Sequence, residues 1–206
     1  MLEPVFILRQ KCVIVTMISK KMKKDFIVLS IFLVALTSCT AVPLSQGTKE
    51  RIARLEWSPI SVRGYNIRGT GDGVYPDSTY CNDLNKEQYG GHSDWRLPTI
   101  DELRSIIQNC SGTELEGKCR ISEANGNLSY YGDYTRRHCH ACKGNNPQEH
   151  SKLPLPSPYI DLVSTSKISD YTFGVGYLYG VDFHEYGSVI LFQEGVRTHI
   201  VCVRNS

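Results

Sequence analysis

The chain has 206 residues, and its 23 Lys and Arg against 21 Asp and Glu give a formal net charge of +2 at pH 7. Residues 1–38 hold six of the basic and two of the acidic residues, which leaves 17 against 19 and a net charge of −2 for residues 39–206. Because no basic tract remains, we do not expect a nucleic-acid partner. Residues 39–206 are enough for one domain with its own hydrophobic core.

Residues 22–38 have the pattern of a bacterial lipoprotein signal peptide. Lys23 and Lys24 precede an apolar run over 26–36, which is shorter than the ~20 apolar residues that a transmembrane helix needs. The run ends at Leu36-Thr37-Ser38-Cys39, which resembles a lipobox. This resemblance implies cleavage before Cys39 and attachment of a lipid such as palmitate to its sulfur, so that acyl groups hold the protein to a membrane.

The segments on either side of this leader are interpreted as follows. Residues 1–21 add a second apolar patch and fit a signal peptide poorly, so we interpret them as an upstream extension from a misplaced translation start; a long n-region is the alternative. Residues 39–50 are expected to be the lipidated cysteine and a polar tether. Because position 40 is Thr and not Asp, the lipoprotein sorting rule implies the outer membrane of a bacterial cell envelope.

The domain is expected over residues 51–206. A first strand is predicted within 51–58, with Leu55 and Trp57 alternating to one side. The turn-rich stretch 64–73 is expected to be a loop. A helix capped by Asp77 or Ser78 is predicted to end near residue 85.

The string Asp94-Trp95-Arg96-Leu97-Pro98-Thr99-Ile100-Asp101-Glu102-Leu103 is the most specific pattern in the chain. Thr99 and Glu102 have the spacing of a capping box, and the preceding proline disfavours an earlier helix start. A second helix is therefore predicted from Ile100 to about Asn109. Trp95 is one of two tryptophans and is expected in the core.

Six cysteines follow Cys39, and an even number in an exported chain predicts three disulfides. These cysteines are Cys81, Cys110, Cys119, Cys139, Cys142 and Cys202. Four of them lie in the irregular stretch 110–160, which is rich in Gly and Asn and needs cross-links to hold it. Spacing alone does not resolve the pairing.

Strand patterns dominate the last part of the chain. Runs rich in β-branched and aromatic residues cover 177–183, 188–193 and 199–204, and Gly-containing turns separate them. Helices followed by an antiparallel meander predict an α+β fold.

Several segments together resemble the Lcl C-terminal domain family, which takes its name from a bacterial collagen-like adhesin. These segments are Leu55-x-Trp57-Ser58, Tyr80–Leu84, Ser93–Leu103, Ile107–Cys110 and Val201–Arg204. The resemblance implies a C-type-lectin-like domain with two helices, a twisted antiparallel sheet and a long disulfide-stapled loop region. The residues that carry the signature of this fold are Trp57, Asp94, Trp95, Arg96, Leu97, Pro98, Thr99, Glu102 and Leu103.

The resemblance also implies a disulfide pairing. A cysteine in the first helix and one in the last strand suggest Cys81 with Cys202. Cys110 and Cys119 bracket a short segment and are expected to close it as a local loop. Cys139 and Cys142 are then left for each other or for chemistry.

The string Arg137-His138-Cys139-His140-Ala141-Cys142-Lys143 concentrates reactive side chains. One hypothesis is a zinc site that adds His150 to the two cysteines, and others are a redox-active pair or covalent haem. A structural disulfide is favoured, because oxidising surroundings disfavour the thiolates that metals need. We therefore expect no metal and no cofactor.

A second cluster consists of acidic residues, and a third of tyrosines. Asp170, Asp182 and Glu185 are candidates to gather near one end of the sheet, although solvated acidic turns are the favoured interpretation. The tyrosines of the second half suit either strand faces or a recognition surface. They include Tyr130, Tyr131, Tyr134, Tyr171, Tyr177, Tyr179 and Tyr186.

The sequence gives no sign of an enzyme. Motifs of serine hydrolases, phosphate-binding loops and zinc proteases are missing. Formylglycine-generating relatives of the family need two reactive cysteines near the C-terminus, where this chain has only Cys202. Asp94 and Arg96 are expected to form a structural ion pair near Trp95. We expect a lipid-anchored adhesion protein that presents loops 111–170 to a glycan, matrix or protein ligand, with the Cys139/Cys142 redox or metal protein as the alternative.

Overall fold

The computed structural model describes residues 43–70, 73–129, 137–140, 142–144, 146–168 and 176–206. These residues belong to one unit, Val42–Ser206. The expected signal peptide and Cys39 lie outside them, so the lipoprotein assignment stays a prediction. Within the described ranges, no helix has the length and apolar character needed to cross a bilayer.

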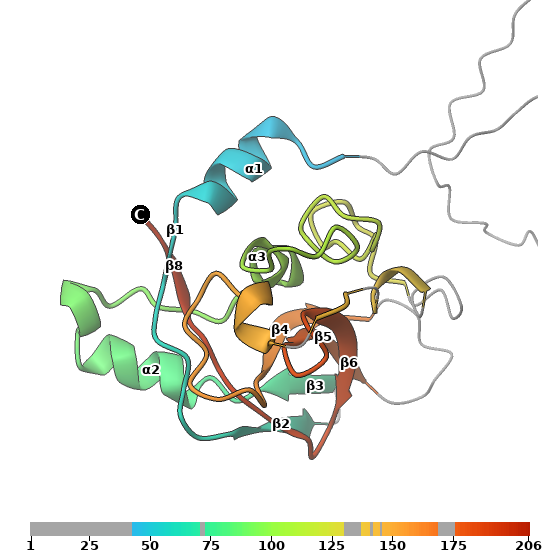
Figure 1. Ribbon diagram of the computed structural model, residues 1–206. Helices are drawn as coiled ribbons and strands as arrows, with labels where there is room; N and C mark the ends of the chain where they lie inside the picture. Colours follow the sequence, from blue (N-terminus) through green and yellow to red (C-terminus); the bar gives the residue numbers. More distant parts are fainter. Residues whose placement is uncertain (1–42, 71–72, 130–136, 141, 145, 169–175) are drawn as a thin grey trace, which may run out of the picture. The chain divides into compact units, whose positions relative to one another are not determined.

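The described residues form three short α-helices and two 3-10 turns (Figure 1). The helices are α1 (Gln46–Ala53), α2 (Thr79–Lys86) and α3 (Ile100–Ser105), and the turns are η1 (Tyr89–Gly91) and η2 (Pro147–His150). Side-chain oxygens cap the starts of α1 and α2, where backbone amides lack helical partners. The Ser45 hydroxyl accepts a hydrogen bond from the Thr48 amide at 3.2 Å, and Asp77 accepts one from the Thr79 amide at 2.9 Å.

The strands form three small antiparallel sheets. The first pairs β1 (Leu55–Trp57) with β8 (Val203–Asn205). The second has the order β3 (Gly73–Pro76), β2 (Tyr65–Thr70) and β7 (Arg197–Thr198). The third has the order β4 (Asp161–Lys167), β5 (Tyr177–Asp182) and β6 (Ser188–Gln193). The architecture is therefore a mixed α+β fold, as predicted.

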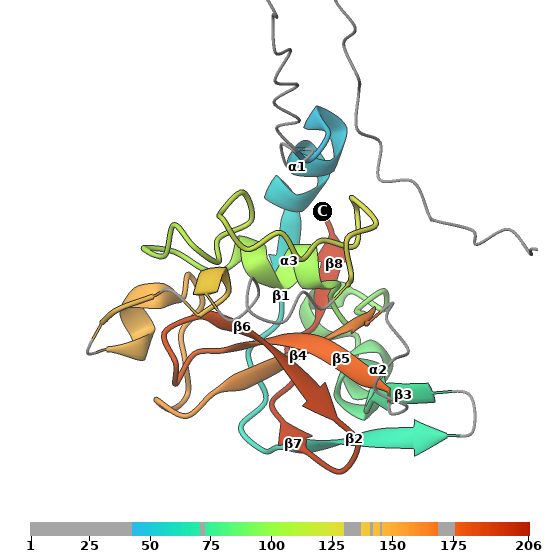
Figure 2. The ribbon, with the colours of Figure 1, turned by 90° about the vertical axis from the view of Figure 1, so that its right-hand side faces the viewer.

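The β4–β5–β6 sheet lies in the middle of the domain and is buried on both faces. Figure 2 shows α3 on one side of it and the β2–β3–β7 sheet on the other. Neighbouring residues of β5 point to opposite sides: Leu178 packs with Trp95 and Ile200, whereas Tyr179 packs with Ile100. The core therefore has two halves separated by this sheet.

The predicted strands at 177–183 and 188–193 are confirmed as β5 and β6, but one predicted loop was wrong and one strand was overlooked. Residues 64–73 contain all of β2 and the first residue of β3 instead of a loop, and the alternation of buried Tyr65 and Ile67 there was overlooked. β4 was not predicted, because its serines read as polar. Those serines are buried and hydrogen-bonded: the Ser164 hydroxyl donates to the Tyr179 carbonyl at 2.7 Å, and the Ser166 hydroxyl accepts from the Ile100 amide at 2.8 Å.

Three boundaries also differ from the prediction. The expected tether over 39–50 and the first strand are interrupted by α1, whose Ile52 is buried against the domain. The second helix ends at Ser105 instead of near Asn109, which adopts a positive φ of 55°. Of the expected strand 199–204, only residues 203–204 lie in a strand, β8, because β7 ends at Thr198 and His199 forms an isolated bridge with Leu162.

Candidate functional site

The capping box predicted from Thr99 and Glu102 is present, and Glu102 is also the centre of an ion-pair network. The Glu102 carboxylate accepts hydrogen bonds from the Thr99 amide at 2.9 Å, from Arg96 at 2.8 Å and from Arg51 at 2.7 Å. Its side chain is fully buried. Burial by itself raises the pKa of Glu102, but the hydrogen bonds from Arg96, Thr99 and Arg51 outweigh it and hold this pKa at about 2. Glu102 therefore ties α1 to the start of α3.

The expected ion pair between Asp94 and Arg96 was wrong. Arg96 turns toward Glu102, and Asp94 instead accepts a hydrogen bond from Arg204 at 2.9 Å. Arg204 also pairs with Glu56 at 2.6 Å. Both acidic partners of Arg204 lie on or near the β1–β8 ladder, so these charges fasten the two ends of the domain together.

Trp95 anchors the signature string in the core. Its side chain is buried, and its indole N–H donates to the Tyr89 carbonyl at 3.1 Å. The Asn85 side chain on α2 bonds both the amide and the carbonyl of Trp95, at 2.7 and 2.8 Å. The other apolar members of the signature are buried or partly buried: Leu97, Pro98 and Leu103. These residues therefore have structural roles in the fold.

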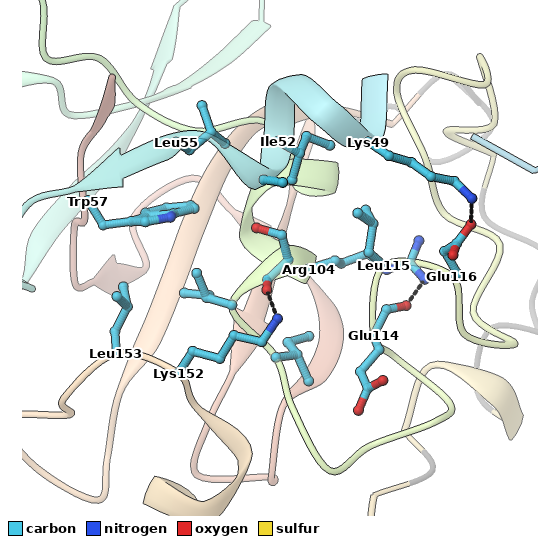
Figure 3. A pocket seen from close by; sticks show the side chains of 14 residues that line it. Lys49, Ile52, Leu55, Trp57, Arg104, Glu114, Leu115, Glu116, Lys152 and Leu153 are labelled. Carbon is cyan, nitrogen blue, oxygen red and sulfur yellow. Dashed lines mark hydrogen bonds and ion pairs between the residues drawn. The ribbon is translucent and has the colours of Figure 1, made fainter. Parts of the chain in front are cut away.

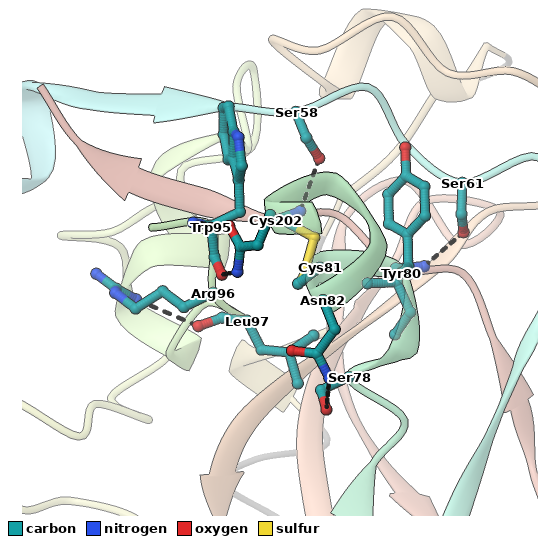
Figure 4. Close-up of a disulfide and its surroundings, with 12 residues drawn as sticks. Ser58, Ser61, Ser78, Tyr80, Cys81, Asn82, Trp95, Arg96, Leu97 and Cys202 are labelled. Carbon is teal, nitrogen blue, oxygen red and sulfur yellow. Dashed lines mark hydrogen bonds between the residues drawn. A yellow bond between two sulfur atoms is a disulfide. The ribbon is translucent and has the colours of Figure 1, made fainter. Parts of the chain in front are cut away.

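The predicted disulfide between Cys81 and Cys202 is present (Figure 4). It links α2 to the residue directly before β8, with a Cα–Cα distance of 5.7 Å. The Ser58 hydroxyl accepts a hydrogen bond from the Cys202 amide at 2.9 Å, which joins the segment after β1 to the same point. This bridge closes the half of the core that contains Trp95.

The other two predicted pairings were wrong. Cys110 is bonded to Cys142, and Cys119 is bonded to Cys139, with Cα–Cα distances of 5.3 and 4.7 Å. The loop over 110–119 closes through its own backbone, because the Cys119 amide donates to the Gly112 carbonyl at 2.7 Å. Its cysteines are therefore free to hold the segment 139–142 against it.

Arg104 fills the interior of this loop region. Its guanidinium donates to the carbonyls of Thr113 at 2.9 Å, Glu114 at 2.6 Å and Ile121. Burial lowers the pKa of Arg104 to about 10. Sequence reasoning missed this role, although one signal was available: Arg104 follows Ile100 by four residues and therefore lies on the buried face of α3.

A groove of about 500 Å³ opens between α1 and the disulfide-stapled loop (Figure 3). It is lined by residues of α1, β1 and the segment 104–107, together with the segments 114–116 and 152–153. Aliphatic side chains and one aromatic side chain form most of its apolar surface: Ile52, Leu55, Trp57, Ile106, Leu115 and Leu153. The mixture of apolar walls and a few polar groups is typical of ligand sites.

The charged groups of the groove are bound to the protein itself. Lys49 forms an ion pair with Glu116 across its mouth, and the Lys152 ammonium donates to the Ser105 carbonyl at 2.6 Å (Figure 3). Glu114 accepts a hydrogen bond from the Cys110 amide at 2.8 Å. These bonds fix the walls in place, so the groove is a preformed feature of the fold.

Trp57 differs from the other groove residues in having an unused polar group. Its ring is half-buried at the apolar end of the groove, near Leu55 and Leu153 (Figure 3). Among the residues that the structure describes, none accepts a hydrogen bond from its indole N–H. Trp95, in contrast, has its donor satisfied within the protein. Trp57 can therefore offer a ligand both an apolar ring and a hydrogen-bond donor.

Comparison with known proteins decides the family. A family model described as the Lcl C-terminal domain matches residues 46–204, which begin at α1 and end in β8. The chain belongs to the Lcl C-terminal domain family. Neither a curated protein nor a solved structure gives a significant match.

In this Lcl C-terminal domain, the cysteines do not form the suggested redox or zinc site. Cys139 and Cys142 belong to different disulfides, so the hypothesis of a Cys139–Cys142 redox pair was wrong. Zinc needs thiolate sulfur, which a disulfide does not provide. Among the described residues, no group of three or more His, Cys, Asp or Glu side chains is arranged to hold a metal. His150, the suggested third ligand, is buried against Tyr186.

The acidic residues at the end of the Lcl domain's central sheet gather differently from the prediction. Asp170 lies outside the described residues, whereas Asp182 stands opposite Asp161 in the β4–β5 register. Burial, followed by the negative charge of Asp182, raises the pKa of Asp161 to about 7. Sequence reasoning overlooked Asp161 because β4 was not predicted. The two carboxylates therefore face each other across the β4–β5 ladder.

The predicted ligand surface, loops 111–170, contributes one wall of the groove. Its members in the groove are Glu114, Leu115, Glu116, Lys152 and Leu153. The tyrosines were also considered as a recognition surface. Tyr179 does not belong to such a surface, because it is buried in the core. Four others lie outside the described residues: Tyr130, Tyr131, Tyr134 and Tyr171. α1 and Trp57 also line the groove; the prediction had divided the residues of α1 between a tether over 39–50 and a first strand within 51–58, and had treated Trp57 as a fold-signature position.

Proposed function

We propose that this protein is a non-enzymatic, lipid-anchored component of the bacterial cell envelope, and that its Lcl C-terminal domain binds a ligand in an adhesin-like role. The family match supports the adhesin-like domain. The lipobox-like string ending at Cys39 and the short apolar run before it support anchoring to the outer membrane. A C-type-lectin-like ancestry is consistent with the mixed α+β architecture and belongs to the same proposal.

The groove beside Trp57 is proposed as the ligand site. The observation that carries this proposal is the half-buried Trp57 ring, with its unused indole N–H, in a groove of about 500 Å³. Aromatic residues of this kind supply a large share of the binding energy at interfaces. A suitable ligand presents an apolar face together with a hydrogen-bond acceptor, as a sugar ring of a glycan or a side chain of a matrix protein does.

The charge of the groove argues against two other classes of function. Lys49 is neutralised by Glu116, and residues 39–206 carry a net charge of −2, so a sulfated polyanion is not favoured. Lys152 and Glu114 are engaged with backbone groups, which leaves them poorly placed as a catalytic acid or base. These features favour a binding site over a catalytic site in the groove.

The test is binding of the mature protein to arrays of glycans and of matrix proteins. Trp57→Ala is expected to lower the affinity for any ligand found by about tenfold or more, because it removes the proposed central contact. The matched control is Tyr159→Ala, which truncates an aromatic side chain that is 68% exposed and lies outside the groove. An equal loss in the control, or full binding by Trp57→Ala, would show that the ligand binds elsewhere, and silence on both arrays would contradict the adhesin role.

A further inference from the structure

The three disulfides differ in how accessible they are to a reductant. Five of the six bonded cysteines are at most 4% exposed, namely Cys81, Cys110, Cys119, Cys139 and Cys202. Cys142 is the exception, because it is only partly buried and is followed by the exposed Lys143. Exposed disulfides are the ones that thiols attack, whereas buried ones resist reduction. The Cys110–Cys142 bridge is therefore the accessible one of the three.

The same bridge lies next to the segment 114–116, which forms one wall of the groove. The wall residues 114–116 follow Cys110 in one tight turn, in which the Thr113 and Glu114 amides donate to the Cys110 carbonyl at 3.1 and 3.0 Å. The Cys110 amide in turn donates to the Glu114 carboxylate at 2.8 Å. Any displacement of Cys110 is therefore transmitted to the groove.

We propose that Cys110–Cys142 is a redox-sensitive latch, whose reduction loosens the wall 114–116 of the groove while the rest of the domain stays folded. The effect on ligand binding rests on the proposed function of the groove, but the order of reduction and the loosening of the wall do not. The domain stays folded because Cys81–Cys202 and Cys119–Cys139 remain, together with the three carbonyl contacts of Arg104.

The reaction is thiol–disulfide exchange with an external dithiol. A thiolate of the reductant attacks Cys142, forming a mixed disulfide, and Cys110 leaves as a thiolate and takes up a proton. The second thiol of the reductant then attacks the mixed disulfide and releases Cys142. The bridge gains two electrons and two protons, and the dithiol becomes a disulfide. The Thr113 hydroxyl, 2.8 Å from the Cys110 sulfur, is placed to donate a hydrogen bond to the departing thiolate.

The first test measures the order of reduction in the mature protein. Limited dithiothreitol treatment is followed by iodoacetamide and by mass-spectrometric mapping of the labelled cysteines. Cys110 and Cys142 are expected to label about tenfold faster than the other four bridge cysteines. Earlier or simultaneous labelling of Cys81 and Cys202, or of Cys119 and Cys139, would overturn the proposal.

The second test measures the wall itself, by trypsin cleavage after the exposed Lys118 under non-reducing conditions. The variant Cys110→Ser/Cys142→Ser is expected to be cleaved there about tenfold faster than the wild type, with its circular dichroism unchanged. The matched control Cys81→Ser/Cys202→Ser is expected to lose thermal stability without this selective cleavage. Equal cleavage of the wild type and the latch variant would overturn the proposal, even if Trp57-dependent ligand binding were established.

Discussion

Two charged residues on α3, Glu102 and Arg104, represent the two differently built halves of this domain. Glu102 forms ion pairs with two arginine side chains, Arg96 and Arg51. Arg104 is held by three backbone carbonyls of the disulfide-stapled loop. The Glu102 carboxylate needs basic side chains as partners, so the residue types around it matter. The Arg104 guanidinium bonds backbone carbonyls, which every residue has, so only the path of the loop backbone matters there. Ion pairs between particular side chains therefore stabilise the first half, whereas hydrogen bonds to the backbone and two disulfides stabilise the second.

The largest expected effect comes from removing the cation of the loop half. Arg104→Met leaves three buried carbonyls without donors, at a cost of about 1–3 kcal/mol each before relaxation. We expect the free energy of unfolding to fall by about 4 kcal/mol, measured by urea denaturation. A loss below about 1 kcal/mol would show that solvent replaces the guanidinium and that the loop does not depend on it.

The two tryptophans provide a comparison within one chain. Trp95→Ala removes a ring that is 6% exposed and hydrogen-bonded, and should cost about 3 kcal/mol of stability. Trp57→Ala removes a half-buried ring from the groove and should cost about 1 kcal/mol. Thermal denaturation of both variants measures this difference. Similar losses would mean that Trp57 is a core residue and not a contact surface.

Glu102 should make stability depend on acid. Its folded pKa of about 2 lies below the ordinary value of 4.5, so its contribution is fully present above pH 4.5 and is lost as the pH falls toward 2. Because Arg51 and Arg96 are partly exposed, we expect this contribution to be about 2 kcal/mol. Denaturation of Glu102→Gln over this pH range should show a flatter profile than the wild type. An unchanged dependence of stability on pH would show that Glu102 does not stabilise the domain in this way.

Asp161 should have the opposite and smaller effect. Its folded pKa is raised to about 7, so it contributes most below its ordinary pKa of 3.8, and this contribution is lost as the pH rises through 7. Asp161→Asn removes this loss. Between pH 5 and pH 8, the free energy of unfolding of the variant should therefore fall by about 1 kcal/mol less than that of the wild type. Asp182→Asn removes the facing charge and should have a similar effect. Parallel pH profiles for all three proteins would contradict the raised pKa of Asp161.

The same division explains what the sequence allowed us to predict. The capping box and buried Trp95 depend on residue types at fixed spacings, and the Cys81–Cys202 bridge was implied by the resemblance to the family; all three are present. The pairing of Cys110 with Cys142 could not be predicted, because it follows from a loop path that Arg104 sets through backbone carbonyls. Only part of the groove was predicted, because the residues of α1 were divided between a tether and a strand, and Trp57 was interpreted as a residue of the fold signature.

The most direct test of the groove as a ligand site uses the two indole N–H signals of the mature protein in a proton–nitrogen NMR spectrum. The chain has only two tryptophans, so Trp95 is an internal control for Trp57. On titration with a ligand found on the arrays, we predict that the Trp57 signal shifts in proportion to the bound fraction and that the Trp95 signal stays in place. A Trp57 signal that stays fixed at saturating ligand would contradict the account.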